Sequence, residues 1–282
     1  MSSALRTRDS DALRFAFGRN WSRFLSSAFN PTREAAARQS VVRLVGTDDL
    51  SNQTFLDIGC GSGIFSLAAF RMGAAVTSFD FDPMSVDCCR KLRESVGSPI
   101  TWTVFQGSVL DDTLMSRLPL ADVVYSWGVL HHTGDMWRAV SLAASRVKPG
   151  GLFCIAVYNR VESRAGGSAT WQRIKRFYVG RSRPVQRVME WAHASYRVAV
   201  MLGTLRNPFA VARAYYHERG MSLWYDYVDW LGGYPYEYAS AGEVFDYGRN
   251  VLGFEALRMN TTSSLGCSEY VFRRPAEATA RP

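Results

Sequence analysis

The sequence lacks the marks of several protein classes. Its five cysteines are odd in number and none are spaced as Cys-x-x-Cys, so we expect a reducing compartment and no disulfide framework. No uncharged apolar run is long enough to span a membrane, and residues 1–11 are polar, without the apolar core of a signal peptide. No internal repeat is visible. These absences predict a cytoplasmic protein with no membrane span.

The bulk composition predicts a globular chain with one unusually basic region. With 282 residues, 47% of them apolar, the chain can form one α/β domain with an elaboration. The net charge is +8, and residues 160–238 carry 12 Lys and Arg against 6 Asp and Glu. Such a region can attract an anionic substrate, nucleic acid or a membrane surface, or it can be an arginine-rich face in water. Composition leaves these alternatives open.

The most informative stretch is a strand that turns through glycines into a helix. Residues 54–57 read as a short buried strand ending in Asp57, and residues 64–72 read as a helix. Between them lie Gly59, Gly61 and Gly63. Glycines let the backbone adopt positive φ and let a ligand come close, while the N–H groups of the new helix point at that ligand. We call this turn the glycine corner.

The spacing of the glycines restricts the class of ligand that this turn is expected to bind. A dinucleotide-binding turn reads G-x-G-x-x-G, whereas here the pattern is D-x-G-x-G-x-G, and Ile64 stands where the third glycine belongs. This pattern resembles the first motif of class I S-adenosylmethionine (SAM) dependent methyltransferases. The alternative is a glycine-rich turn with no ligand.

Two further strand ends are expected to bind the cofactor. Residues 75–80 form a strand ending in Asp80, where doubly wound nucleotide folds place an acid for the ribose hydroxyls. Asp82 precedes a helix and is alternatively its N-cap, so we assign the ribose to Asp80 and the adenine face to Phe81. The third strand, residues 100–105, leads to the segment 107–109. Related methyltransferases often have an acid after this glycine, but here Ser108 takes its place.

Strands and helices alternate from residue 54 to residue 159, which predicts a parallel, doubly wound sheet. The fourth strand, residues 121–126, is followed by a His-His pair, and the fifth covers residues 152–158. Ligands bind beyond the carboxyl ends of such strands. The polar residues expected at these ends are Asp57, Asp80, Ser108, His131, His132 and Tyr158.

Four motifs of this sequence occur in the same order as in bacterial class I methyltransferases of the ubiquinone-methylase-like (type 11/12) group, which the chain therefore resembles. They are D-x-G-C-G-S-G, the Asp80 strand end, S-W-G-V-L-H-H and K-P-G-G. The resemblance covers about residues 55–158, and residues 220–237 look like a block of some small-molecule methyltransferases. It implies SAM as cofactor and a Rossmann-like sheet, mostly parallel with an antiparallel last strand. The implied cofactor-binding residues are Asp57, Gly59, Cys60, Gly61, Gly63, Asp80, Phe81, Gly107, Ser108, Val109, Ser126 and Trp127.

The chain divides into four parts. We expect an N-terminal helical segment (1–46), a SAM-binding α/β domain (47–159 and 240–275), a helical cap insertion (160–239) and a disordered tail (276–282). The first segment contains an aromatic face and a second helix at 31–45. The final helix, 240–252, begins with a capping box of Ser240 and Glu243. The aromatic face consists of Phe15, Phe17, Trp21, Phe24 and Leu25.

The cap carries two patterns. An aromatic block, residues 224–238, is expected to line the acceptor pocket above the cofactor. A helical apolar stripe is expected to be core between cap and sheet, with a membrane-binding face as the alternative. The stripe consists of Val185, Val188, Met189, Ala192, Tyr196, Ala199 and Leu202.

Methyl transfer from SAM is an in-line displacement, so the protein mainly aligns acceptor, methyl and sulfur. A hydroxyl or protonated-amine acceptor must also lose a proton, for which His132 and His131 are the first candidates, although the pair alternatively only packs. We expect no metal, because no third ligand has a sensible spacing. The other candidate proton acceptors are Tyr158, Asp229 and Tyr234.

Three functions compete. The favoured one is methylation of an O or N atom of a small molecule (a metabolite, sugar or natural-product intermediate) that is anionic or aromatic. An RNA methyltransferase using the basic cap is disfavoured, because the sequence has no recognised RNA-binding module and no Asn-Pro-Pro-Tyr-type motif after the fourth strand. The third is a non-catalytic SAM-binding protein.

Overall fold

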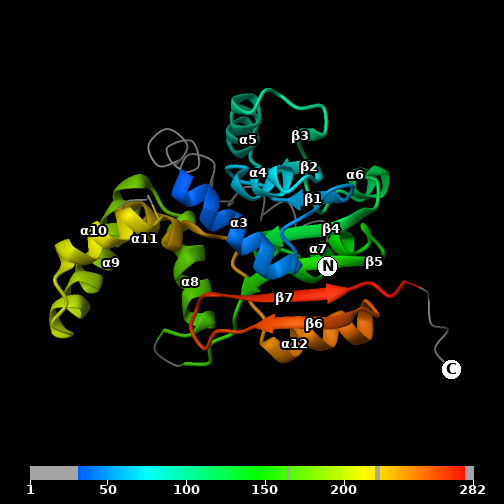
Figure 1. Ribbon diagram of the computed structural model, residues 1–282. Coiled ribbons are helices and arrows are strands. Elements are labelled where there is room, and N and C mark those ends of the chain that lie inside the picture. The colour runs from blue at the N-terminus through cyan, green and yellow to red at the C-terminus, as the bar shows by residue number, and fades with distance from the viewer. Residues whose placement is uncertain (1–30, 164–165, 220–222, 277–282) are drawn as a thin grey trace.

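A seven-stranded sheet forms the centre of the molecule. The computed structural model describes residues 31–163, 166–219 and 223–276, with backbone alone at 216–219 and 225 (Figure 1). The strand order is β3-β2-β1-β4-β5-β7-β6, in which β1 to β5 are parallel and β7 is antiparallel to both neighbours. The predicted sheet with its antiparallel last strand is therefore confirmed. The strands are β1 (Thr54–Ile58), β2 (Ala75–Asp80), β3 (Trp102–Gln106), β4 (Ala121–Trp127), β5 (Val147–Tyr158), β6 (Glu255–Asn260) and β7 (Cys267–Arg273).

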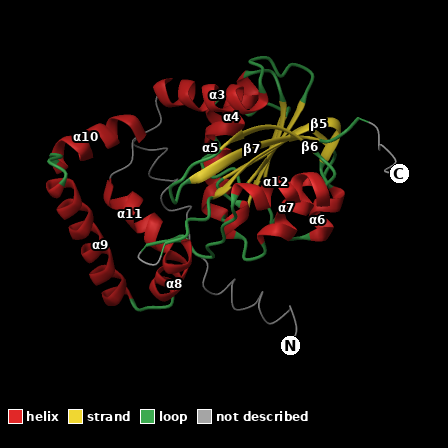
Figure 2. Cartoon of the chain, turned by 90° about the horizontal axis from the view of Figure 1, so that it is seen from below, coloured by secondary structure: helices red, strands yellow, loops and turns green. Residues whose placement is uncertain are grey.

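Helices cover both faces of this sheet (Figure 2). Successive strand residues point to opposite faces, so Phe55 joins one hydrophobic core and Leu56 the other. The first core is closed by α3 (Pro31–Val45), α4 (Ile64–Arg71) and α5 (Pro83–Ser95). The second is closed by α6 (Asp112–Arg117), α7 (Met136–Ala144) and α12 (Ala241–Asp246). Both faces of the sheet are thus buried, as parallel strands require.

The strand order reverses between β1 and β4. From β1 the chain moves outward to β2 and β3, then returns to the other side of β1 with β4 and β5. Doubly wound sheets bind their ligands at such a reversal, outside the carboxyl ends of the strands. The fold therefore directs attention to the segments after Ile58 and Trp127.

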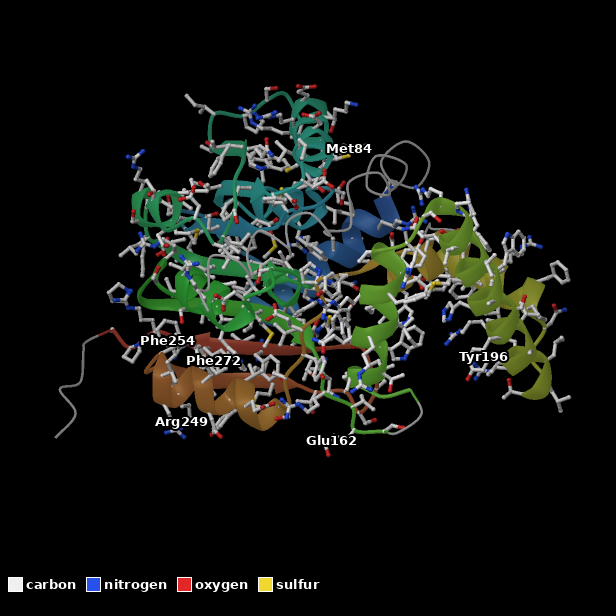
Figure 3. The ribbon with its side chains drawn as sticks, turned by 180° about the vertical axis from the view of Figure 1, so that it is seen from behind. Met84, Glu162, Tyr196, Arg249, Phe254 and Phe272 are labelled. Carbon is white, nitrogen blue, oxygen red and sulfur yellow. The ribbon has the colours of Figure 1, made fainter. Side chains whose placement is uncertain are left out.

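The last helix differs from the one predicted. Ser240 and Glu243 form the expected capping box, but the α-helix ends at Asp246 and a π-helical turn, Tyr247–Val251, follows. Gly248 in this turn lies against the ring of Phe272, where a Cβ would come within 2.3 Å. Figure 3 shows Phe272 and Phe254 between this segment and the sheet, with Arg249 on the outer side. The close approach of helix to strand explains the glycine.

The cap is inserted at one point of the sheet edge. It consists of α8 (Ser168–Val179), α9 (Arg183–Gly203), α10 (Pro208–Arg219) and α11 (Leu223–Gly232), and α9 and α10 lie farthest from the sheet (Figure 2). Asn159 and Ala239 pair as a parallel bridge. The Ala239 N–H donates to the Tyr158 carbonyl at 3.0 Å, and Arg160 donates back to Ala239 at 3.0 Å.

The expectation that the apolar stripe of α9 is core between cap and sheet is wrong. Val188, Tyr196 and Leu202 are 69%, 64% and 59% exposed. Helix α9 instead packs on α8, α10 and α11, with Glu190 and Met201 on its buried face. Figure 3 shows Tyr196 on the part of the cap that lies away from the sheet. The apolar periodicity of the sequence identified one face of this helix, but it did not identify which part of the protein that face contacts.

Two expectations lie outside the described residues: the aromatic face of residues 15–25 and, apart from Ala276, the tail of residues 276–282. The second N-terminal helix is present as α3. Within the part of the chain that the structure describes, no helix combines the length and apolar character needed to cross a membrane.

Candidate active site

The glycine corner joins β1 to α4 with three left-handed residues. The φ angles of Gly59, Gly61 and Gly63 are 76°, 54° and 82°. Residues with a Cβ rarely adopt such positive φ angles. Packing adds a second constraint at two of them. A Cβ on Gly59 would lie 2.4 Å from the side chain of Val129, and one on Gly63 would lie 2.6 Å from the sulfur of Cys89. The corner therefore depends on both backbone conformation and close contact.

Asp80, at the end of β2, holds the glycine corner in place. Its carboxylate accepts hydrogen bonds from the N–H of Gly61 and from the N–H of Asp82, each at 2.9 Å. Burial raises the pKa of Asp80 to about 6. Asp82 accepts from Met84 N–H at 2.8 Å and caps α5, which is the role weighed as its alternative. Phe81 between them is 47% exposed.

Asp57 is buried near the end of β1, next to the glycine corner. Its carboxylate accepts the hydroxyl of Ser66 at 2.5 Å, and Ser66 accepts the hydroxyl of Ser78 at 2.8 Å. Ser78 in turn accepts the indole N–H of Trp102 at 3.0 Å. Burial raises the pKa of Asp57 to about 7. This buried polar chain connects β1, α4, β2 and β3, and sequence reasoning missed it because the partners share no local pattern.

The segment after β3 is built as a tight turn. The Gly107 N–H donates to the Asp80 carbonyl at 2.9 Å, and a Cβ on Gly107 would lie 2.4 Å from Leu114. The Ser108 hydroxyl accepts the N–H of Leu110 at 3.2 Å, and Val109 is buried. The expected adenine contact of this segment stays a prediction.

Three other expected cofactor residues are already engaged within the protein. The Ser126 hydroxyl is buried and donates to the Ile58 carbonyl at 2.9 Å. Trp127 is 40% exposed, and its indole N–H donates to Glu269 at 3.0 Å. Cys60 is buried against Cys89, and this contact, with burial, raises the pKa of its thiol. Of the three, Trp127 alone presents substantial surface.

The two histidines after β4 have different surroundings. His132 Nδ1 lies 2.6 Å from the carbonyl oxygen of Pro235, and because a carbonyl only accepts, this nitrogen carries the proton. The lone pair of the neutral ring is then on Nε2. His131 is fully buried, and its Nδ1 accepts the N–H of Tyr158 at 3.2 Å. Burial lowers the pKa of His131 well below its ordinary value, so it stays neutral.

The remaining candidate proton acceptors lie around this pair. The ring of Tyr158 packs 4.0 Å from that of His131, and burial raises the pKa of Tyr158 well above its ordinary value. The phenol of Tyr158 is therefore uncharged near pH 7 and contributes to the site as an aromatic surface. Tyr234 is half-buried and precedes the cis peptide bond to Pro235. Asp229 lies one helical turn before Gly233, whose N–H donates to its carbonyl at 2.9 Å.

Lys175 in α8 is a buried cation that sequence reasoning missed. It has 0% exposure, its ammonium donates to the carbonyl of Trp230, and it lies 4.1 Å and 4.9 Å from the ring centres of Trp230 and Tyr236. Burial lowers the pKa of Lys175 to about 7, and the charge of Asp229 opposes that shift. The sequence offers no clear signal for this burial, because it depends on how α8 packs against α11.

The loop after α11 brings the cap onto the histidines. The Glu237 N–H donates to the His131 carbonyl at 2.9 Å. Its carboxylate accepts the N–H of Gly134 at 3.0 Å and that of Met136 at 3.2 Å, at the start of α7. A Cβ placed on Gly233 would lie 3.2 Å from His132 Cε1 and 3.5 Å from Lys175 Nζ. The histidine ring and the ammonium thus flank one point of the cap loop.

The two hollows found among the described residues lie away from the glycine corner, and those residues form no metal site. Two shallow hollows lined by described residues, about 210 and 320 Å³, lie at the opposite edge of the sheet, where Thr54 and Ala75 begin β1 and β2. The strand ends that bind ligands in this fold are on the other side. Across residues 31–163, 166–219 and 223–276, no three His, Cys, Asp or Glu side chains gather as a metal site.

Comparison with known proteins identifies the family. A model of the methyltransferase domain matches residues 29–197. The ubiquinone biosynthesis O-methyltransferase of Methylobacterium sp. (strain 4-46) is 33% identical over 137 residues, which are 47% of this chain and 53% of that relative. The one from Brucella ovis is 27% identical over 195 residues, 64% of this chain and 77% of the relative. The chain spans about half the length of the first of these relatives.

Solved structures share the fold. Magnesium protoporphyrin IX methyltransferase from Synechocystis PCC 6803 superposes with a TM-score of 0.54 at 16% identity, covering 95% of this chain and 99% of that one. An O-methyltransferase family protein from Burkholderia thailandensis gives 0.50 at 16% identity, covering 90% and 62%. Such low identities establish the architecture alone, whereas the family model covers more than half of the sequence. The chain belongs to the family of methyltransferase domains.

Proposed function

We propose that the protein is a SAM-dependent methyltransferase that methylates an oxygen or nitrogen atom of a small molecule. The observation that carries this proposal is the fixed tautomer of His132 between the carboxyl edge of the sheet and the aromatic cap. A ring whose Nδ1 is held by a carbonyl presents its basic Nε2 for proton removal, as general bases require.

The residues at the strand ends fit SAM. Three left-handed glycines open β1 toward α4, and the Asp80 carboxylate lies beside them at the end of β2, where a ribose is bound in related folds. The Synechocystis methyltransferase of similar fold was solved with bound SAH and, in another structure, with SAM. SAM supplies a methyl group on a positively charged sulfur, a leaving group that needs no acid. Phe81 and residues 107–109 would hold the adenine.

The protein's own part in the reaction is to position the acceptor and take its proton. His132 Nε2 accepts the proton of the acceptor hydroxyl or amine, and the Pro235 carbonyl stabilises the resulting imidazolium through Nδ1. His131 stays neutral and positions the start of the cap through the Tyr158 N–H.

The walls of the site favour a flat acceptor. Tyr158, Trp230 and Tyr236 pack against one another with ring centres 5.0 to 6.3 Å apart. Aromatic walls bind planar or apolar molecules well. The relatives named as ubiquinone biosynthesis O-methyltransferases support oxygen as the methylated atom. All five cysteines are free thiols, in keeping with a cytoplasmic location.

The test is methyl transfer from isotope-labelled SAM to a bacterial metabolite extract, read by mass spectrometry. We expect label in one or a few small molecules with the wild-type protein and much slower labelling of the same molecules with His132→Ala. Label that appears only in added RNA, or in nothing although SAM binds, would overturn the proposal. A folded protein that does not bind SAM would overturn the cofactor assignment as well.

A further inference from the structure

We infer that the outer surface of the cap binds the anionic headgroups of a phospholipid bilayer and so docks the protein peripherally on a membrane. Helix α9 and the start of α10 form this surface, and both helices lie on the side of the cap away from the sheet (Figure 2). The inference goes beyond the proposed function and does not depend on it. It is carried by an uncharged helix face, by two almost fully exposed apolar side chains and by the arginines around them.

The side of α9 that faces away from the rest of the cap carries apolar and small side chains and no charge. The buried residues Glu190 and Met201 mark the side that packs on the cap. Successive residues of an α-helix are about 100° apart, so the opposite side is centred on Ala192 and Ala199. The exposed side chains on it are Pro184, Val185, Val188, Ala192, Ser195, Tyr196, Ala199 and Leu202. This face extends over about five turns, and such a contiguous apolar surface marks a binding site.

Two more apolar side chains are displayed where α9 leads into α10. Leu205 is 96% exposed and Phe209 is 86% exposed. The φ of Leu205 is 56°, a left-handed conformation that is uncommon for leucine. Side chains of this size gain free energy when they leave water for the boundary between headgroups and acyl chains. We call these two side chains and the exposed face of α9 the outer cap surface.

The cap around the outer cap surface is strongly basic. Residues 166–215 contain eight exposed arginines, and the one acid in this range, Glu190, is buried. The arginines are Arg173, Arg176, Arg181, Arg183, Arg187, Arg197, Arg206 and Arg213. Arg206 lies in the turn before α10, and Arg213 follows Phe209 by one turn on the same side of α10. Anionic lipids attract such arginines, whose long stems let the guanidinium groups stay among the headgroups while apolar neighbours insert.

Other occupants match this surface less well. A second copy of the chain would bring two sets of eight arginines together, and like charges repel. A nucleic acid would pair with the arginines, but it would leave the aliphatic side chains of Val188 and Leu202 in water, because bases stack on aromatic rings. An anionic bilayer matches both the charge and the apolar side chains.

The experiment measures sedimentation of the full chain with vesicles of phosphatidylcholine alone and with vesicles of equal parts phosphatidylcholine and phosphatidylglycerol. We expect at least about tenfold tighter binding to the anionic vesicles, which weakens as salt is raised. Leu205→Ser combined with Phe209→Ser should weaken that binding at least about tenfold, because two inserting side chains are lost. The matched control Ile100→Ser, which removes a side chain of the sheet domain that is 95% exposed, should leave the binding unchanged.

A second pair of variants tests the contribution of charge near the outer cap surface. Arg206→Gln combined with Arg213→Gln should weaken binding to the anionic vesicles, because two guanidinium groups no longer meet the headgroups. Arg90→Gln combined with Lys91→Gln removes the same net charge from exposed positions of α5 and should weaken it less.

Equal binding to both kinds of vesicle, or binding to neither, would overturn the inference. Undiminished binding of the protein with Leu205→Ser and Phe209→Ser would also overturn it, because the protein would then adsorb through its net charge alone. A dimer in sedimentation velocity that these substitutions dissociate would assign the surface to a second copy instead. Circular dichroism checks the fold of each variant, and Val188→Ser combined with Leu202→Ser decides the matter if the first pair does not fold.

Discussion

His132 of the sheet domain donates its Nδ1 hydrogen to the carbonyl of Pro235 in the cap across 2.6 Å. The two residues are 103 positions apart in the sequence. The contact fixes the tautomer of the ring, and it makes the orientation of the proposed base depend on the docking of the cap. Under the proposed function, this one hydrogen bond would couple acceptor binding to proton removal.

Replacing His132 by alanine should reduce kcat about 100-fold or more, because a general base contributes that much. SAM affinity should stay within about twofold, since the ring is not among the expected cofactor contacts. Single-turnover kinetics and calorimetry measure the two quantities. The matched variant His131→Ala should instead lower the melting temperature, because it removes a fully buried ring and leaves the part-buried Tyr158 N–H without its acceptor. Full activity in His132→Ala would exclude the base.

Gly61→Val should abolish SAM binding while the protein remains folded. A valine disfavours the φ of 54° at this position and places a side chain where the methionyl part of SAM is expected. Calorimetry measures the affinity, and circular dichroism checks the fold. An unchanged affinity in the folded variant would refute the site assignment.

Cofactor-free protein should become less stable as the pH rises from 5 to 8, in part because of Asp57. Burial raises its native pKa to about 7, above the unfolded value of about 3.9, so the native state binds the proton more tightly in this range. The free energy of unfolding therefore falls as the pH rises through about 7. Thermal melts of wild type and Asp57→Asn at several pH values measure the difference. Identical pH dependence in both proteins would argue against this contribution.

Trp230→Ala should impair turnover and also lower stability. The indole contacts Tyr158, Trp171 and Lys175, so its loss leaves a cavity and removes one wall of the proposed pocket. We expect a melting temperature lower by several degrees and a raised KM for the acceptor, with SAM affinity near wild type. Trp230→Phe, which keeps an aromatic ring at this position, should retain most of the turnover and most of the stability. Intact turnover in a folded Trp230→Ala protein would place the acceptor elsewhere.

The sequence was most informative about features that depend on residues close together in the chain. Three glycines at alternate positions predict a left-handed turn, and alternating strands and helices predict a doubly wound sheet, because backbone conformation and periodicity decide both. The capping box of Ser240 and Glu243 was visible for the same reason. The methyltransferase family and the antiparallel last strand are confirmed.

Long-range contacts were not visible in the sequence. Lysines are rarely buried, so Lys175 reads as a surface residue until α8 and α11 are placed together. The apolar stripe of α9 was assigned to the wrong environment because helix periodicity does not say which neighbour a face meets. The catalytic and cofactor-binding assignments stay predictions, since side-chain partners such as Pro235 come from distant segments.

The bridge between Asn159 and Ala239 has a consequence for how such proteins diversify. Because the insertion leaves and rejoins the sheet at neighbouring positions, its two ends need no rearrangement of β5 or α12 to accommodate a different insert. A recombination event with one crossover near each end would transfer the whole cap between relatives as a cassette. If the cap selects the acceptor, as the proposed function implies, selectivity would be inherited separately from the cofactor site, and chimaeras joined at these two residues would exchange it.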